Sequence, residues 1–486
     1  MLRALLTFWK FIPEIPAPPP LSSTALRYLR VGGAALVLLF TALLGPLLVK
    51  TQDSLNATLL VTAVLALPIG LVGFRIVTQF RSINVLLVLI TCIFIPIGFQ
   101  ARGSYVVLSL ILAALFLGLW LLRMLVVERR FHFVPGPHNW PILGFSLVVI
   151  ISTVWSNIFR DVIIIVPTSL VFVQGASAMV MLCLVGLYLM VDNYFSEIKW
   201  LKAMVAILLA GGFFGLVNEF VVQTLPVQTR GTFTMWVMAC TYSLVLFHKG
   251  LSWPQRLGMF ALMVGWAYWS FGLRITWLAS WLPALVALLT LSFMRSRKLL
   301  AGLILAALIW AVVNWSYVEQ TINAETDESG HTRLEAWYMN WTVTSEHLLF
   351  GTGPGGYAVY YMTYFPTNAM ATHNNYIDVI SQLGLPGFIF YVWFFIAVAW
   401  QGFRLCRRLK GRGDFAEALA NAAFAGTLGC IVINAFGDWL IPFAYTQGIA
   451  GFDYAAYNWL LMACIPVLDR ITRTETHPTA LAHAAA

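Results

Sequence analysis

Long apolar runs separated by short polar segments dominate the pattern of the chain. A helix needs about 20 mostly apolar residues to cross a bilayer, and many of these runs approach that length. The fourteen candidate runs lie at 31–49, 57–74, 83–99, 104–127, 140–158, 170–192, 200–222, 231–248, 257–272, 275–294, 299–316, 376–400, 417–437 and 450–468. The runs that are short or interrupted by polar residues are 83–99, 257–272, 417–437 and 450–468. Strand-like alternation is absent. The pattern therefore predicts an all-α fold, a polytopic transmembrane helix bundle of 12–14 spans.

The composition supports a membrane protein and excludes several other classes. Of the 486 residues, 60% are hydrophobic and 10% are charged, whereas about 25% are charged in an ordinary soluble domain. Soluble and disordered proteins are therefore excluded, and the net charge of +9 is too dilute for a nucleic-acid-binding face. The six cysteines form no C-x-x-C pair, so neither a disulfide framework nor a zinc site is expected. The run 31–49 is expected to act as a retained signal anchor.

The distribution of basic residues predicts the orientation of the chain, because cytoplasmic loops collect Lys and Arg. If the N-terminus is cytoplasmic, 23 of the 29 basic residues fall in inner segments and every inner loop is basic. Both termini are then cytoplasmic. The predicted divisions are a cytoplasmic N-terminal segment (1–30), a transmembrane bundle (31–316), a periplasmic loop (317–375), C-terminal transmembrane helices (376–468) and a cytoplasmic tail (469–486).

The loop 317–375 is much longer than the other predicted outer loops and is expected to be partly helical. Its segment 333–350 has apolar residues at helical spacing. The predicted stripe consists of Leu334, Trp337, Trp341 and Leu348. The run G-T-G-P-G-G at 351–356 lacks the G-K-[ST] ending of a phosphate-binding loop, so it is interpreted as a turn. An ordered loop of this length is usually functional.

Six basic residues fall on the predicted outer side, where the positive-inside rule disfavours them. They are Lys50, Arg102, Arg160, Arg230, Arg274 and Arg333. Five of the six are Arg, whose planar fork of donors suits bidentate phosphate binding better than a Lys ammonium does. Alternatively, each Arg pairs with a local acid or reaches toward the lipid headgroups. The neighbouring Asp161 favours that alternative for Arg160.

His373 opens the strongest local pattern, T-H-N-N-Y-I-D-V-I-S-Q-L-G-L-P-G at 372–387. A His at the mouth of a span can be a neutral base near neutral pH. Gly384 and Gly387, three residues apart, are expected to let another helix approach closely. In the alternative interpretation His373 is an interfacial residue that caps the helix, with Asn374 and Asn375 as N-cap residues.

Other chemical classes find little support in the sequence. His331 and His347 are interpreted as exposed loop residues, and no pattern of metal ligands or of a serine nucleophile is present. The acids within apolar runs lie near outer ends, which argues against a proton-coupled transporter because acidic relays normally lie near the midplane. These acids are Glu219, Asp378, Asp438 and Asp453.

Together these motifs resemble the O-antigen ligase and polymerase superfamily of bacterial inner membranes. The pattern H-[NSQ]-x9-G-x-x-G is met by His373, Asn374, Gly384 and Gly387. The stretches R-L-E-A-W (333–337) and L-L-F-G-T-G-P-G-G (348–356) are similar to the loop motif of the family. The stretches R-G-T-F (230–233) and L-R-I-T-W-L-A (273–279) are similar to its other Arg-bearing outer segments. The resemblance covers roughly 230–390, and residue 388 departs from it by being Phe rather than small and polar.

Within this superfamily the chain most resembles the O-antigen ligases, which move a polysaccharide from undecaprenyl pyrophosphate to a sugar hydroxyl of lipid A-core at the periplasmic face. The resemblance implies a metal-independent glycosyltransferase of the inner membrane that uses no cofactor. The implied roles are a base for His373, pyrophosphate binding for Arg333 and Arg274 and, more weakly, Arg230, support for Arg160 and Arg102, and substrate binding for Asn374 and Trp337.

Several alternatives share parts of this pattern. An O-antigen polymerase uses the same donor with another lipid-linked repeat as acceptor, and a protein O-glycosyltransferase of the superfamily uses a Ser or Thr. A lipid-linked oligosaccharide transporter would be expected to carry charges through the bilayer, whereas the motif charges here crowd the outer face. Peptidoglycan polymerases of similar shape use an acid in a long outer loop, where this chain has Glu335 but also the His-Asn motif.

Overall fold

The computed structural model describes residues 81–101, 104–274, 278–316, 319, 331–366, 371–443 and 447–476. The chain forms two compact units. One contains Met1–Ile83 and Gly118–His132, and the other contains Asn84–Leu117 and Phe133–Ala486. In the described part of the first unit, the Nε atom of Arg123 lies 3.0 Å from Oε1 of Glu128. All candidate site residues belong to the second unit, although Arg102 lies outside the described residues.

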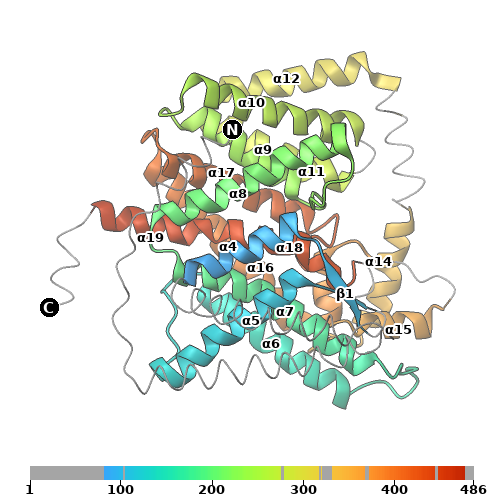
Figure 1. Ribbon diagram of the computed structural model, residues 1–486. Coiled ribbons are helices and arrows are strands. Elements are labelled where there is room, and N and C mark those ends of the chain that lie inside the picture. The colour runs from blue at the N-terminus through green and yellow to red at the C-terminus, as the bar shows by residue number, and fades with distance from the viewer. Residues whose placement is uncertain are drawn as a thin grey trace, which may run out of the picture. The chain divides into compact units, whose positions relative to one another are not determined.

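Helices account for most of the described residues (Figure 1). They are α4 (Arg81–Phe94), α5 (Leu108–Arg123), α6 (Asn139–Ile158), α7 (Leu170–Tyr194), α8 (Ile198–Val217), α9 (Phe233–Phe247), α10 (Trp253–Ala267), α11 (Leu278–Arg295), α12 (Arg297–Val313), α14 (His331–Thr344), α15 (Tyr357–Tyr364), α16 (Asn375–Leu409), α17 (Phe415–Ile433), α18 (Phe452–Met462) and α19 (Cys464–Thr476). Three π-helical segments, η1 (Met124–Glu128), η2 (Asn218–Val222) and η3 (Tyr268–Leu273), extend α5, α8 and α10, and a short 3-10 helix, η5 (Ile449–Gly451), precedes α18.

Seven helical stretches within the described residues are long and apolar enough to cross a membrane. They are Leu108–Glu128, Asn139–Ile158, Leu170–Tyr194, Ile198–Val222, Leu278–Arg295, Asn375–Leu409 and Phe415–Ile433. The predicted all-α, polytopic transmembrane bundle is thereby confirmed. The runs 31–49 and 57–74 lie outside the described residues, so the total of 12–14 spans stays a prediction.

A short antiparallel hairpin interrupts two of the predicted apolar runs. Strand β1 (Gly98–Ala101) pairs with β2 (Ser104–Val107), with Gly98 opposite Val107. The helix α4 ends at Phe94 because Pro96 cannot donate a backbone hydrogen bond and disfavours helical geometry in the residue before it. The runs 83–99 and 104–127 are therefore only partly helical.

Proline also divides the last predicted run, 450–468. A proline ring clashes with the carbonyl group four residues earlier in a helix. For Pro466 that carbonyl belongs to Met462, where α18 ends. The second helix, α19, continues to Thr476, so the predicted tail from residue 469 begins as helix.

Small residues let α17 pack at the centre of the second unit, against α9, α11 and α16. The helix is rich in alanine, and nearly all of its side chains are buried. A Cβ atom added at Gly426 would lie 2.3 Å from the ring of Trp236. At Gly429 it would lie 2.3 Å from the sulfur of Met235. Such close approach is typical of packed membrane helices, whose interfaces collect small residues.

Candidate functional site

The helix α16, which begins directly after the His373 segment, is broken at Gly384. Gly384 has a left-handed φ of +70°, which divides this helix into two parts. The break frees carbonyl groups, and the glycine-rich turn 351–356 binds them: Thr352 N donates to Ser381 O and Gly353 N donates to Gln382 O, both at 2.9 Å. Three glycines of the turn have positive φ, which glycine adopts without steric cost. The interpretation of 351–356 as a turn is thereby confirmed.

The role expected for Gly384 is corrected by this arrangement. A Cβ atom there would lie 2.7 Å from Leu348 O and 2.6 Å from Leu349 O. Leu348 O also accepts a hydrogen bond from Leu385 N at 2.7 Å. The group that approaches Gly384 is therefore the backbone of the outer loop and not another helix. Gly384 thus joins this backbone to α16, whereas a Cβ atom at Gly387 would meet the side chain of Leu383 in its own helix.

His373 lies in the short segment that leads into α16, and its backbone is unusual. Its φ of +47° is in the left-handed region, which non-glycine residues rarely adopt and which is often found at functional sites. Its side chain is 46% exposed, so it is accessible to a substrate. The following residue, Asn374, caps α16: its side-chain oxygen accepts from Tyr376 N at 3.0 Å and from Ile377 N at 3.2 Å. The capping alternative is thus confirmed for Asn374, and its expected substrate contact stays a prediction.

A buried carboxylate faces His373. Oδ1 of Asp438, from the segment after α17, lies 3.8 Å from Nδ1 of His373. The same oxygen accepts a hydrogen bond from Nε2 of Gln447 at 3.0 Å. The Tyr454 hydroxyl in turn donates to Oε1 of Gln447 at 2.6 Å. A chain of polar groups therefore leads from α18 to the imidazole.

In the sequence Asp438 stands out only as an acid near the predicted outer end of a span. It is 65 residues from His373, and no local pattern connects the two. The connection comes from Asn375: its Nδ2 donates to Ile441 O at 2.8 Å, and its Oδ1 accepts from Leu440 N at 3.2 Å. Asn375 therefore holds the segment that carries Asp438 against the start of α16. The doubled Asn after His373 is the one sequence signal that could have indicated such a clamp.

The helix α14 supports the other side of the His373 segment. The indole nitrogen of Trp337 donates to Thr372 O at 2.7 Å, directly before His373. Arg333 lies one turn earlier on the same helix and is half-buried. Among the described residues, no group accepts a hydrogen bond from its buried Nε. The structure therefore brings Trp337, and with it the turn that carries Arg333, to the candidate base.

The apolar stripe predicted for this helix is wrong in part. α14 ends at Thr344, before Leu348, and its buried face is formed by Ala336, Asn340, Val343 and Thr344. Leu334 and Trp341 are exposed instead. Polar residues are buried here because they find partners on α16: Asn340 Nδ2 donates to the Ser381 hydroxyl at 3.1 Å.

Arg230 lies close to the Asp438 segment. It is exposed and precedes Gly231, which has a φ of +66°. A Cβ atom at Gly231 would lie 2.9 Å from the ring of Trp439, the residue after Asp438. The charges of Arg230 and Asp438 both act electrostatically on the Tyr454 hydroxyl. The structure thus brings Arg230 into the surroundings of the candidate base.

Arg274 lies at the end of η3, at the same end of the bundle as Arg230. Its guanidinium carbon is 5.6 Å from the centre of the Trp269 ring. Trp269 packs edge-to-face on Trp266 with ring centres 5.4 Å apart. Trp266 packs in the same way on Phe233, at 6.2 Å. Because Phe233 is three residues after Arg230, this aromatic row connects the two Arg-bearing segments.

Arg160 lies near the end of α6, apart from the residues around His373. Its guanidinium donates to Oδ1 of Asn157 at 2.8 Å, and no described contact connects it to the His373 segment. The neighbouring Asp161 pairs with His347 instead, at 3.2 Å from Nε2. The expectation that His347 is exposed is therefore wrong: its side chain is 13% exposed.

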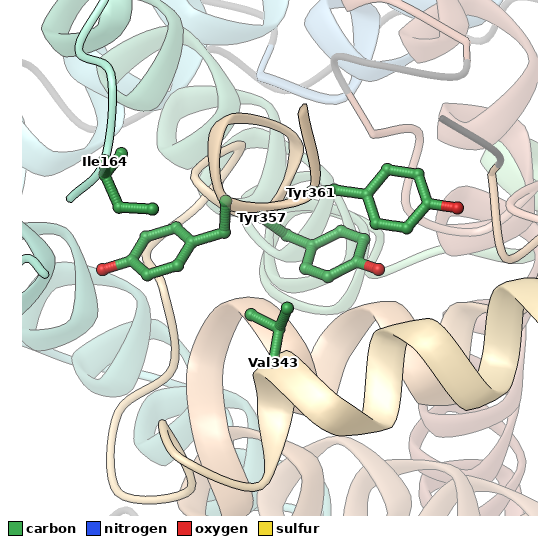
Figure 2. Packing of buried hydrophobic residues seen from close by; sticks show 5 residues of the cluster. Ile164, Val343, Tyr357 and Tyr361 are labelled. Carbon is green, nitrogen blue, oxygen red and sulfur yellow. The ribbon is translucent and has the colours of Figure 1, made fainter. Parts of the chain in front are cut away.

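An apolar cluster packs α14 and α15 against the segment after α6. The side chains of Ile164, Val343, Tyr357 and Tyr361 gather between α14, α15 and the segment after α6 (Figure 2), together with Tyr360. Burial raises the pKa of the Tyr357 hydroxyl, so that hydroxyl stays protonated at neutral pH. The cluster supplies rigidity to the helix that carries Arg333 and Trp337, because Val343 lies on the same helix.

The arrangement has the elements of a general-base site for an anionic substrate. A neutral imidazole whose Nδ1 faces a carboxylate presents Nε2 as a proton acceptor. The arginines at the same end of the bundle offer fixed donors to phosphate oxygens. Exposure of His373, Arg230 and Arg274 leaves them accessible, while Asp438 is buried and held by Gln447.

Comparison with known proteins gives a match to part of the chain. Residues 258–392 match the family model described as O-Antigen ligase. The matched region includes Arg274, Arg333, Trp337, His373 and Asn374, whereas Arg160, Arg230 and Asp438 lie outside it. No curated protein matches the chain. The match shows that residues 258–392 of this polytopic helical membrane protein are similar to the O-antigen ligase family.

Proposed function

We propose that this protein is an O-antigen ligase of the bacterial inner membrane. It transfers a polysaccharide from undecaprenyl pyrophosphate to a sugar hydroxyl of lipid A-core at the periplasmic face. The observation that carries the proposal is the pairing of an exposed His373 with the buried Asp438 at a bundle end that also presents Arg230 and Arg274. The match of residues 258–392 to the ligase family supports the same reaction class.

The reaction needs a base for the acceptor and charge stabilisation for the leaving group. In the proposed step Nε2 of His373 takes the proton of the acceptor hydroxyl while its oxygen attacks the anomeric carbon of the donor. The bond from that carbon to the pyrophosphate oxygen breaks, and undecaprenyl pyrophosphate leaves with the electron pair. A positioned general base typically contributes about 10²–10⁴-fold to such a step. Asp438 orients the imidazole and stabilises the imidazolium that forms.

The arginines bind the departing pyrophosphate. Arg333 and Arg274 are the principal ligands, Arg230 is a third, and Arg160 and Arg102 support the site more remotely. Fixed donors aimed at developing negative charge are effective in a partly dehydrated site, because they need no reorganisation during the reaction. The donor is activated by its own pyrophosphate, so the reaction needs neither a nucleotide nor a metal ion. Asn374 and Trp337 complete the substrate-binding surface.

The lipid substrates reach the site laterally from the bilayer. The outer ends of α8 and α10 expose the aromatic rings of Phe220 and Tyr268, which stack with centres 6.2 Å apart. Exposed aromatic rings at such a level are typical of the membrane interface. This edge lies beside Arg274, so we propose it as the entrance for the polyprenyl donor.

The test is the lipopolysaccharide profile of a deletion strain that expresses His373→Asn. A ligase defect leaves long polysaccharide chains on undecaprenyl pyrophosphate and a bare lipid A-core, which is the expected result. Core carrying a single repeat would instead assign the protein as a polymerase. Unchanged lipopolysaccharide with loss of a glycoprotein would assign it as a protein glycosyltransferase. His132→Ala, at an exposed histidine far along the chain, is the matched control and should restore the full profile.

A further inference from the structure

Trp269 contacts an acid and a base at the same time. Its indole nitrogen donates to Oε2 of Glu219 at 3.0 Å. The guanidinium carbon of Arg274 lies 5.6 Å from the centre of its ring. Glu219 thus binds the N–H edge of the indole, while Arg274 interacts with the ring itself. Guanidinium groups bind aromatic rings in this way through the negative face of the π system.

The indole is held rigidly. Trp269 packs edge-to-face on Trp266, and the indole nitrogen of Trp266 donates to Gly212 O at 2.9 Å. Both tryptophans are almost completely buried. Arg274 N also donates to Trp269 O at 3.0 Å, so the backbone of Arg274 is fixed to the same residue. This bond fixes the backbone of Arg274 but not its side chain, whose restraint comes from the contact with the Trp269 ring.

The local helix geometry places these groups. Glu219 belongs to η2 and Trp269 to η3, and both segments are π-helical. Such segments are rare in proteins, and those that occur often lie at functional sites. The additional residue per turn redirects the side chains that follow. Within the described residues Glu219 forms no ion pair with a basic side chain, so its hydrogen-bond partner is the indole.

We propose that Glu219 and Trp269 are positioning residues for Arg274. The indole N–H engages the carboxylate and keeps it from pairing directly with the guanidinium. The ring restrains that guanidinium and leaves its fork of donors available to the pyrophosphate of the donor lipid. Restraint before binding improves affinity because less conformational freedom is lost in the complex. This inference rests on the proposed function, in which Arg274 binds pyrophosphate.

The test measures binding of undecaprenyl pyrophosphate to the full-length protein in nanodiscs, without an acceptor. Trp269→Leu removes both contacts and is expected to weaken binding about tenfold. Trp269→Phe keeps a ring for Arg274 but not the N–H group, and should weaken binding by a smaller factor. Glu219→Leu should behave like Trp269→Phe, and Glu219→Gln, whose amide oxygen still accepts from the indole, should recover most of that loss. Trp253→Phe, at an exposed tryptophan at the start of α10, the helix that η3 extends, is the matched control.

A double-mutant comparison separates positioning from a general structural effect. If Trp269 acts through Arg274, then adding Trp269→Leu to Arg274→Lys weakens binding no further. Additive losses, or Trp269 variants that bind like wild type while Arg274→Lys does not, would overturn the positioning role. Thermal unfolding of each variant in the same nanodiscs checks that Trp269→Phe and Glu219→Gln remain folded. Failure of the wild-type protein itself to bind undecaprenyl pyrophosphate would overturn the proposed function, and the positioning role with it.

Discussion

Nδ1 of His373 lies 3.8 Å from Oδ1 of Asp438, and that oxygen is already held by Gln447. The separation exceeds the range of a hydrogen bond. Catalytic hydrogen bonds are often long in the absence of substrate and shorten in the complex. Asp438 is buried and fixed, whereas His373 is exposed, so we expect a small rotation of the imidazole on substrate binding to close the pair. The carboxylate then selects the tautomer in which Nε2 is free to accept a proton.

Replacement of Asp438 should therefore abolish most activity without unfolding the protein. We expect Asp438→Asn to lower kcat by about 10²–10⁴-fold, the range of a positioned general base, because the neutral amide does not stabilise an imidazolium. Gln447→Leu should have a smaller effect in the same direction, because it only releases the carboxylate. The measurement is transfer by purified protein from lipid-linked donor to lipid A-core. Wild-type turnover in Asp438→Asn would show that the acid is merely a neighbour of His373.

The break in α16 should be intolerant of any side chain at residue 384. Gly384→Ala brings a Cβ atom within 2.7 Å of two backbone carbonyls and imposes a left-handed φ on alanine. We expect a loss of more than about 1 kcal/mol in stability and a loose outer loop. Gly302→Ala is the control, because a Cβ atom there meets nothing within 4 Å. Thermal unfolding in detergent compares the two, and equal melting temperatures would contradict the docking role of Gly384.

The pattern of the sequence predicts the helices well where apolar runs are uninterrupted, as at 140–158 and 170–192, which match α6 and α7 closely. Apolar character alone does not locate breaks, so the hairpin after α4 was not expected. The stripe predicted on α14 is wrong in part because tertiary hydrogen bonds allow Asn340 to be buried while Trp341 is exposed.

Residues of the candidate site can likewise be predicted from the sequence only where the signal is local. His373 and its glycines form a local motif, and a sequence displays such motifs directly. Asp438 reaches His373 only because Asn375 binds the backbone at Leu440 and Ile441, and pairings of this kind depend on tertiary structure. The sequence indicates the arginines because they lie on the predicted outer side of the membrane, where the positive-inside rule disfavours them. Their supports, such as Trp269 beneath Arg274, became visible only in the fold.

Conservative replacement of the arginines should separate bidentate binding from a diffuse positive field. Arg333→Lys and Arg274→Lys keep the charge but lose the planar fork, so both are expected to lose most transfer activity. Arg160→Lys is a useful comparison, because Arg160 binds Asn157 and has no described contact with the His373 segment, and its loss should be smaller. Turnover is measured with saturating acceptor while the donor is varied. Near-normal kinetics in both principal variants would mean that the residues act through charge alone or through structure.

The predicted orientation can be tested with single added cysteines. All six native cysteines are buried, so an impermeant thiol reagent should label the wild-type protein little. Tyr338→Cys replaces an exposed residue of α14 and should be labelled from the periplasmic side of intact cells. Lys410→Cys, also exposed, should be labelled only after the inner membrane is permeabilised. Labelling in the opposite pattern would reverse the topology and place the candidate base in the cytoplasm.

The backbone of His373 determines which variant tests its chemistry most cleanly. A φ of +47° is strained for alanine, whereas asparagine adopts left-handed geometry more readily than most residues. His373→Asn should therefore insert and melt like the wild type, while His373→Ala should be somewhat less stable. Both should be inactive, because neither provides a base for the acceptor proton. Transfer assays and thermal unfolding on the same preparations make the comparison. An active His373→Asn enzyme would remove His373 from the chemistry, and an inactive but equally stable one would show that its role is chemical and not structural.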